Sequence, residues 1–359
     1  MVSLDREKNL SRYMSPLGVL TLVIVVCALL LGESSWGDNA STTSQEAANL
    51  DRLLDIPKGE EAGNSNHERL PYHLGSIASL VVILLSLTTA MLLNSRTAGR
   101  RILGTSLAAV FCLAVALIIA WLASLGTFSN TRAHLLPTDS LKPGMMIFMG
   151  LLFSGSGLLL GFIAYSQAQA RETMDSLQLG LRNEVESYGQ VSRILHWTTA
   201  ILFILLFPMG VYTSMIPEDV WYRQGYYVAH KTIGFTLLGL VILRLIWHRF
   251  SPKPGQDNHL KSWEKKSAHA AHILLYVLMI GFPISGYVLS TYAGKLSHFF
   301  IWDTPMLFDA NREMLMPFLL THKVVLPVVF YVVFFAHVAG VIKHRYIDRS
   351  VRTLRRMVG

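Results

Sequence analysis

The chain has 359 residues, of which 52% are hydrophobic and 15% are charged, and its mean hydropathy is +0.42. Soluble domains carry about a quarter charged residues, so this composition excludes a soluble multidomain enzyme and indicates a helical membrane protein. The formal net charge is +8, but the basic residues cluster between apolar segments, which is typical of cytoplasmic loops and not of nucleic-acid binding. Both cysteines, Cys27 and Cys112, lie in apolar segments, so neither a disulfide framework nor a cysteine-ligated metal site is expected.

The first apolar segment, residues 17–32, follows three basic residues and fits either an uncleaved signal anchor or a signal peptide. We favour the anchor, because no small-x-small cleavage site follows directly. Residues 33–71 then carry eight acidic residues and few large apolar ones, which predicts an unpacked external loop.

Further apolar segments are each long enough to cross about 30 Å of hydrocarbon as a helix. They cover residues 74–94, 102–126, 143–168, 195–214, 227–247, 270–290 and 322–342. Basic residues concentrate in alternate connections and in the C-terminal tail, which places both termini in the cytoplasm and the acidic loops outside. The sequence therefore predicts an all-α integral membrane protein with about eight transmembrane helices.

The amphipathic segment 169–194 divides these helices into two sets of four. We predict that it is a cytoplasmic linker and that the domain boundary lies within it. Residues 1–180 form an N-terminal membrane region of unknown role. Residues 186–359 form a C-terminal four-helix domain that holds ten of the thirteen histidines.

Four histidines of this domain lie inside predicted helices or at their ends: His196, His230, His322 and His337. Imidazole at membrane depth is costly unless it is paired or ligated, so all four are candidate ligands. In the predicted topology His196 and His337 lie near the cytoplasmic face, and the other two lie near the external face. Pro327 can kink or rewind the helix that carries His322 and His337. Two bis-histidine sites stacked in a four-helix bundle match the needs of two b-type haems.

Five stretches of the C-terminal half occur in an informative order. They are Arg193-Ile-Leu-His196-Trp197, Ala229-His230-Lys231-Thr-Ile-Gly234, Leu243-Arg244-Leu-Ile-Trp247, Ala268-His269-Ala-Ala-His272 running into Phe282-Pro283-Ile-Ser-Gly286, and Ala336-His337 followed by Lys343-His344-Arg-Tyr-Ile-Asp348-Arg349. In order, spacing and helix placement they resemble the bacterial cytochrome b561 family, four-helix di-haem quinone cytochromes that include superoxide oxidase. The membrane cytochrome subunits of formate dehydrogenase and nickel–iron hydrogenase are more distantly similar.

The resemblance implies that His196 and His337 are the axial ligands of a cytoplasmic-side haem, and that His230 and His322 ligate an external-side haem. It also implies a protein of the bacterial inner membrane. Lys323 departs from the family pattern, because many members have an acid directly after the histidine that begins the last helix. A cation therefore replaces an acid beside the external haem.

Other basic and histidine residues are candidates for binding the haem propionates or a quinone. Arg244 and Lys231 are expected to pair with propionates, although snorkelling to lipid headgroups is an alternative. His269 and His272 share one helical face and would bind a propionate or a quinone carbonyl, or lie in the membrane interface. The family places quinone near His344, which equally fits one more cation in a basic tail. Ordinary interfacial roles are expected for His248, His259 and His298.

The predicted function is electron transfer, in which two haem b groups relay single electrons between a donor at the external face and membrane quinone. Superoxide oxidation coupled to quinone reduction is one form of it, since basic external residues would attract this anion. The alternative is a haem-bearing membrane anchor of a larger respiratory or redox complex, with a soluble partner docked on external loops such as 291–321. A third possibility is a transporter or non-haem scaffold with accidental histidine pairs.

Overall fold

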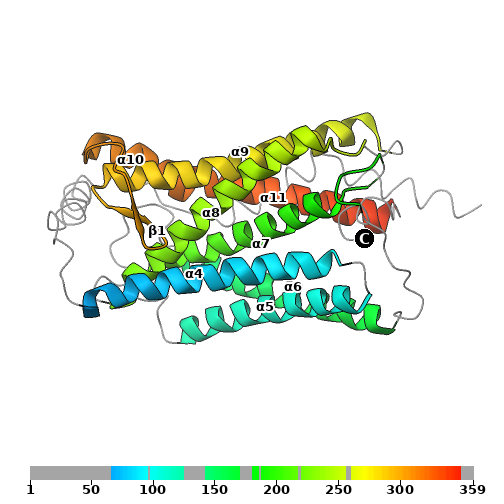
Figure 1. Ribbon diagram of the computed structural model, residues 1–359, viewed down its shortest axis with the longest axis horizontal. Coiled ribbons are helices and arrows are strands. Elements are labelled where there is room, and N and C mark those ends of the chain that lie inside the picture. Colours follow the sequence, from blue (N-terminus) through cyan, green and yellow to red (C-terminus); the bar gives the residue numbers. More distant parts are fainter. Residues whose placement is uncertain are drawn as a thin grey trace, which may run out of the picture. The chain divides into compact units, whose positions relative to one another are not determined.

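A computed structural model describes residues 66–95, 98–124, 142–169, 180–185, 187–216, 220–255 and 260–348. Its elements are α4 (Asn66–Leu93), α5 (Ala98–Ser124), α6 (Lys142–Gln169), α7 (Gln190–Thr213), α8 (Arg223–Phe250), α9 (Ser262–Tyr292), β1 (Ser297–Phe299), β2 (Trp302–Thr304), α10 (Arg312–Leu320), η3 (Thr321–Val325), α11 (Leu326–Ile342) and η4 (Lys343–Ile347) (Figure 1). In this part of the chain seven helices are long and apolar enough to cross a membrane, the last of them formed by α10, η3 and α11 together. The protein is thus an all-α integral membrane protein. The predicted first helix, residues 17–32, lies outside the described residues.

The membrane helices match the later predicted segments but extend beyond them. α4 begins at Asn66, within the predicted external loop, and α9 begins at Ser262 instead of residue 270. The last membrane helix begins at Arg312 instead of residue 322. The predicted ends were therefore too short, because helical hydrogen bonding continues into polar residues that hydropathy excludes. Between α9 and α10, the chain also forms a two-stranded antiparallel hairpin that was not predicted.

The described end of the predicted linker, between residues 180 and 189, contains no helix and is tied to the end of α8. The Asn183 backbone N–H donates to the Ser251 hydroxyl, and the Asn183 amide group donates to the Ser251 carbonyl oxygen. The Gly189 N–H donates to the Asn183 side-chain oxygen. Arg193, which was predicted to belong to the linker, instead lies buried in the first turn of α7.

Apolar packing in the C-terminal half centres on one buried cluster. Its members are Leu202, Phe203, Ile233, Leu237, Val241, Leu278, Met279, Phe330 and Val333. The ring of Phe207 stacks on that of Phe330 with centroids 3.8 Å apart, and Phe203 meets Phe282 edge to face at 5.7 Å. Because Phe330 lies near the middle of the segment between His322 and His337, this aromatic layer separates two histidine levels.

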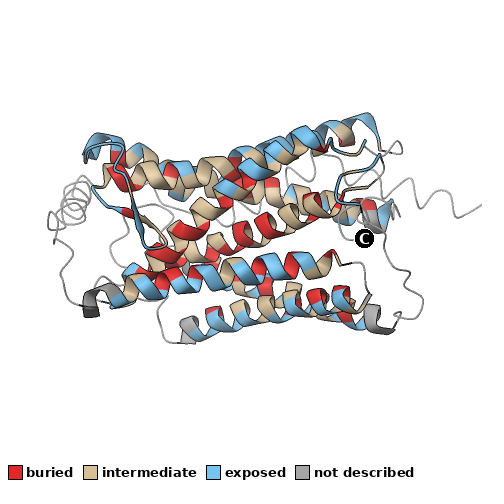
Figure 2. Cartoon of the chain, viewed as in Figure 1, coloured by how far each residue is buried: buried red, intermediate tan, exposed pale blue. Residues whose placement is uncertain are grey.

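Large apolar side chains remain exposed on the outer faces of the helices, where Figure 2 shows pale blue ribbon. Leu117, Leu151 and Phe162 are 70%, 68% and 67% exposed. Exposed apolar surface of this extent is unfavourable in water but matches hydrocarbon, so these faces contact lipid.

The last membrane helix changes its hydrogen bonding twice, at η3 and η4, which are both π-helical turns. In η3 the Leu326 N–H donates to the Thr321 carbonyl oxygen, five residues earlier. Pro327 follows directly and has no N–H to donate, so one extra residue in the preceding turn accommodates the interruption. The predicted rewinding beside Pro327 is confirmed, and it falls on the turn that carries His322.

α4 precedes the predicted linker in sequence but packs against α7 and α8 (Figure 1). The backbones of α4 and α8 touch at two glycines. A Cβ atom on Gly75 would lie 2.1 Å from the Gly225 carbonyl oxygen, and one on Gly225 would lie 2.4 Å from the Pro71 carbonyl oxygen. Glycine at such a crossing allows close backbone approach, which is a main source of membrane-helix association. The crossing lies a little over one turn before His230, so α4 supports the helix that carries this histidine.

Gly75→Ala is expected to destabilise the protein by about 1–3 kcal/mol, because the added methyl group would overlap backbone atoms that cannot move alone. Gly155→Ala is the matched control, since a Cβ atom there meets nothing within 4 Å. Thermal unfolding of both variants in detergent measures the difference. Equal thermal midpoints would contradict the close α4–α8 crossing.

Candidate functional site

His230 of α8 and His322 of η3 lie at one level of the bundle, close enough for His322 to act electrostatically on His230. Each imidazole ring lies against a glycine. A Cβ atom on Gly210 would lie 3.3 Å from Cε1 of His230, and one on Gly286 would lie 2.8 Å from Cε1 of His322. The His230 Nδ1 atom is buried and has no hydrogen-bond partner among the described residues. At this level both imidazoles therefore pack directly against helix backbone, in space that a side chain at either glycine would take up.

The hydrogen bonds around His322 determine which ring nitrogen is available. The Ser285 hydroxyl lies 2.9 Å from His322 Nδ1 and 3.0 Å from the Phe282 carbonyl oxygen. It has one hydrogen, which it donates to the carbonyl, so it accepts from the His322 Nδ1–H. His322 then presents the lone pair of Nε2. This arrangement is typical of metal-ligating histidines, whose second nitrogen is held by a hydrogen bond. Ser285 was not predicted from the sequence.

A second level contains His196 of α7, His337 of α11 and His272 of α9. His337, His272 and Arg244 all act electrostatically on His196. The rings of His272 and His337 meet edge to face with their centroids 5.2 Å apart. The structure thus brings together four of the predicted site residues, and it places His272 nearer to His337 than the sequence indicated.

This second level also contains buried polar atoms with no hydrogen-bond partner among the described residues. They are His196 Nδ1, Arg244 Nε, His248 Nδ1 and the Tyr276 hydroxyl. The Arg244 guanidinium lies over the Tyr276 ring, with Cζ 5.2 Å from its centroid. A guanidinium, a phenol and imidazoles in one buried place suit an anionic group, because a buried cation needs a partner. His248, for which an ordinary interfacial role was expected, lies half-buried in the last turn of α8 and acts electrostatically on His196.

Sequence reasoning missed Tyr276, although it lies four residues after His272 and hence on the same face of α9. Tyr188, directly before α7, also acts electrostatically on Arg244. A tyrosine in or near a membrane helix does not stand out in the sequence as a site residue. Their significance depends on Arg244, which comes from a different helix.

The other predicted residues are not part of these histidine levels, although Lys231 and Lys323 act electrostatically on His230 and His322. Lys231 Nζ donates to the Leu296 carbonyl oxygen at 3.2 Å, and the Phe300 N–H donates to the Thr232 hydroxyl at 3.0 Å. These bonds fasten the β1–β2 hairpin to α8 directly after His230. His269 and Lys323 are exposed.

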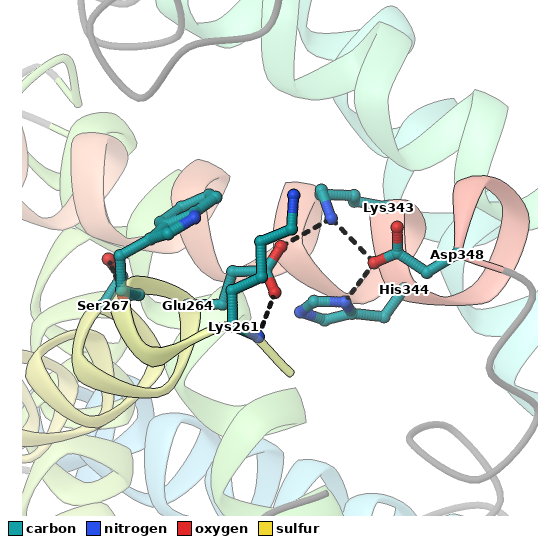
Figure 3. Close-up of polar contacts among 7 residues, drawn as sticks. Lys261, Glu264, Ser267, Lys343, His344 and Asp348 are labelled. Atoms are coloured by element: carbon teal, nitrogen blue, oxygen red, sulfur yellow. Dashed lines mark hydrogen bonds and ion pairs between the residues drawn. The ribbon is translucent and has the colours of Figure 1, made fainter. Parts of the chain in front are cut away.

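His344 belongs to an ion cluster that joins the start of α9 to the end of the last helix (Figure 3). Lys343 Nζ lies 2.7 Å from Glu264 Oε1 and 2.7 Å from Asp348 Oδ2. His344 Nδ1 lies 2.7 Å from the same Asp348 oxygen. Glu264 also accepts from the backbone N–H of Lys261 and so caps α9. Glu264 and Asp348 were not predicted as site residues, although an acid three residues after a helix start and an i,i+4 His–Asp pair are recognisable signals.

The interactions within this cluster favour the charged forms of Asp348 and Lys343. Burial raises the pKa of Asp348, but hydrogen bonds from Lys343 and His344 outweigh burial and leave its pKa lowered. Burial lowers the pKa of Lys343, but bonds to Asp348 and Glu264 outweigh burial and leave its pKa raised. The Glu264, His344 and Asp348 ligand atoms lie within 4.8 Å of one another, as in a metal site. The Lys343 ammonium bridges the two carboxylates and balances them instead.

Comparison with known proteins places the part of the chain that carries both histidine levels in a known family. The sequence profile of the family described as prokaryotic cytochrome b561 matches residues 187–359. Cytochrome b561 homolog 2 of Escherichia coli strain K12 is 33% identical over 188 residues, which cover 50% of this chain and 96% of that protein. Cytochrome b561 homolog 1 of the same organism is 26% identical over 180 residues, covering 47% and 96%. The putative cytochrome YdhU is 23% identical over 165 residues, covering 43% of this chain and 59% of that protein.

The ion cluster leads to a prediction about pH. Because folding lowers the pKa of Asp348, its stabilisation is present above the ordinary carboxyl pKa and is lost as pH falls through the folded-state pKa. Asp348→Asn is therefore expected to cost about 0.5–1 kcal/mol at neutral pH, allowing for solvent screening, and less below about pH 4.

Thermal unfolding of wild type and variant across that pH range measures this difference. Asp309→Asn, which alters an exposed carboxylate in the loop before α10, is the control. A difference that stays constant with pH would mean that Asp348 is not paired as described.

Proposed function

Because this chain belongs to the prokaryotic cytochrome b561 family, we propose that it is a di-haem cytochrome that carries electrons between an external donor and membrane quinone. Membership of the family makes it a bacterial multi-pass membrane protein that binds haem b and transfers electrons. Residues 186–359 would form the cytochrome domain, in agreement with the matched range. The observation that carries the proposal is the presence of two histidine pairs at two levels of one bundle.

The residues present fit two haems. At one level His230 and His322 would be the axial ligands, with both rings packed against glycines and with Nε2 of His322 available. At the other level His196 and His337 would be the ligands, and Arg244 would lie close enough to balance the propionates. Bound haem b supplies an iron that takes up and releases one electron at a time. The protein holds the ligands, excludes water and tunes the potential through charges and hydrogen bonds.

The cytoplasmic-side level would be the one formed by His196 and His337. The distribution of basic residues supports this orientation, with both termini in the cytoplasm. We place quinone near this level, toward His344, with His269 and His272 as further groups able to meet a quinone carbonyl. Reduction of a quinone to a quinol takes up two electrons and two protons. His344 and Asp348, which share a hydrogen bond near the helix end, can hold and exchange such protons.

For the donor we propose superoxide. Each superoxide ion gives up one electron and becomes dioxygen, so two superoxide ions, one quinone and two protons give two dioxygen molecules and one quinol. Lys231 and Lys323 follow the two external-side histidines and would attract this small anion. Reduction of the purified protein by a superoxide source, followed by quinol formation, tests this activity directly.

A second candidate function is that of a haem-bearing anchor in a larger redox complex. The loop between α9 and α10 supports it, because Ile301, Trp302 and Leu307 are 65%, 62% and 57% exposed there. Such side chains suit a protein interface, although aromatic residues also line membrane interfaces. Stoichiometric co-purification of a soluble partner from membranes would favour the anchor, and superoxide-dependent quinol formation by the isolated chain would favour the enzyme.

The purified protein is expected to contain two haem b groups per chain, and His337→Ala is expected to lose the cytoplasmic-side haem while largely keeping the other. Haem quantitation per chain and reduced-minus-oxidised spectra measure both. His73→Ala is the control, because His73 is an exposed histidine outside the cytochrome domain. Retention of both haems by His337→Ala would reject the pairing.

Lys323→Glu is expected to lower the midpoint potential of the external-side haem by roughly 30–60 mV, because a cation favours the reduced iron. Lys323 is exposed, and its charge acts on His322. Lys323→Gln should give about half of that shift. Redox titration at low and high salt measures the effect, which should weaken as salt screens the charge. Identical midpoints in all three proteins would show that this lysine does not tune the site.

A further inference from the structure

The β1–β2 hairpin between α9 and α10 contacts a helix from each half of the chain. Within the cytochrome domain it is fastened to α8, where the fully buried Thr232 hydroxyl accepts from the Phe300 N–H at 3.0 Å. From the N-terminal membrane region, the Tyr72 ring of α4 meets the His298 ring edge to face, with the centroids 5.0 Å apart. The hairpin therefore joins the cytochrome domain to a region for which the sequence indicated no role.

His298 takes part in both attachments. Its carbonyl oxygen accepts from the Thr232 hydroxyl at 3.5 Å, while its ring lies against Tyr72. Its Nδ1 atom lies 2.5 Å from Oδ1 of Asp303, the residue opposite it on β2. Because an edge-to-face contact depends on ring orientation, the cross-strand bond to Asp303 helps to hold the imidazole against Tyr72.

The tip of the hairpin has a backbone conformation that needs support from its surroundings. Phe300 has a φ angle of 56°, in the left-handed region that a bulky residue seldom adopts. Such conformations persist where neighbouring contacts hold them. Here the Phe300 N–H is bonded to Thr232, and the Phe299 ring meets Phe235 of α8 edge to face with the centroids 6.1 Å apart. The tip is therefore held at one place on α8.

The close crossing of α4 and α8 sets the position of Tyr72. The carbonyl oxygen of the preceding residue, Pro71, lies against Gly225, and Gly75 lies against the same glycine one turn later. Tyr72 is half-buried between these two contacts along α4. Any movement of α4 along α8 would therefore move this ring away from His298.

The hairpin also holds a charge beside the external-side histidine level. Lys231 directly follows His230, and its ammonium donates to the carbonyl oxygen of Leu296, directly before β1, at 3.2 Å. The bond ties a flexible side chain to the hairpin, and the charge of Lys231 acts on His230. Without this bond the side chain would extend toward water and headgroups, as long basic side chains do near helix ends. The distance of the charge from His230 thus depends on where the hairpin lies.

We propose that Tyr72 of α4 and Thr232 of α8 are positioning residues that hold the hairpin in place, and that the hairpin in turn fixes the Lys231 ammonium beside the external-side haem. The second part rests on the proposed function, because it requires a haem between His230 and His322. A fixed cation there favours the reduced iron and attracts an anionic donor. The N-terminal membrane region thus acts on the electron-accepting end of the cytochrome domain through an aromatic contact.

Hydrogen exchange of the full-length, haem-loaded protein in detergent tests the attachment, with peptides covering residues 297–304 followed by mass spectrometry. Tyr72→Leu removes the ring but keeps an apolar side chain, and Thr232→Val removes the hydroxyl group. Each is expected to raise the exchange rate of this segment at least about fivefold. The matched controls are His73→Ala, at the exposed neighbour of Tyr72, and Thr236→Val, whose hydroxyl donates within α8 to the Thr232 carbonyl oxygen. Exchange in Tyr72→Leu at the rate of these controls would overturn the role of α4.

Redox titration of the external-side haem tests the consequence. Lys231→Gln is expected to lower the midpoint potential, and Tyr72→Leu and Thr232→Val are expected to lower it by part of that shift. Tyr72→Phe keeps the ring and should match wild type in both measurements. In the Lys231→Gln background, Tyr72→Leu should cause no further shift, because no charge remains to be moved.

Two results would overturn the link to Lys231: faster exchange with an unchanged potential, or shifts from Tyr72→Leu and Lys231→Gln that simply add. The haem spectrum of each variant verifies that the cytochrome bundle is intact. Absence of an external-side haem from the wild-type protein would reject the proposed function and the second part of this proposal with it. The exchange measurement decides the attachment of the hairpin to α4 in either case.

Discussion

An imidazole ring buried among membrane helices requires a partner, because hydrocarbon offers no water to satisfy its polar nitrogens. The C-terminal bundle gathers such rings at two levels, where the partner that we propose is haem iron. Each level draws histidines from two or more helices, so the requirement can be met only when these helices pack with the correct rotation and depth. The aromatic layer around Phe330 keeps the levels apart, and glycines such as Gly286 let the rings approach the helix backbone closely. The way in which the helices pack therefore determines where the histidines lie.

The last membrane helix serves both levels, and the π-helical turn η3 is part of how it does so. An uninterrupted α-helix would rotate His322 and His337 apart by about 60°, since fifteen steps of 100° do not complete whole turns. The π turn before Pro327 alters the rotation locally and places His322 against Ser285, which fixes its protonated nitrogen. Pro327 thus influences the position of His322, five residues earlier, without a polar contact between the two.

Charges at the end of the bundle that carries the C-terminal helix are arranged as a balanced cluster. In the cluster of Glu264, Lys343, His344 and Asp348, two acids balance the cations and join α9 to η4, directly after α11. Such a cluster holds the two helices together without any added component.

The amino-acid sequence by itself determined the fold class, the approximate position of each described membrane helix and the family. These properties depend on composition, on the length of apolar segments and on motifs close together along the chain. The depth of the four histidines also follows from the sequence, because helical rise is regular.

Only the tertiary structure decided which side chains surround them. Tyr276, His248 and Ser285 become significant through neighbours on other helices, and the burial of Arg193, which the sequence placed in a linker, appears only in the packed structure. Rotation and crossing of helices are set by the summed packing of many small contacts, such as the meeting of Gly75 and Gly225, and no local pattern of residues specifies that sum.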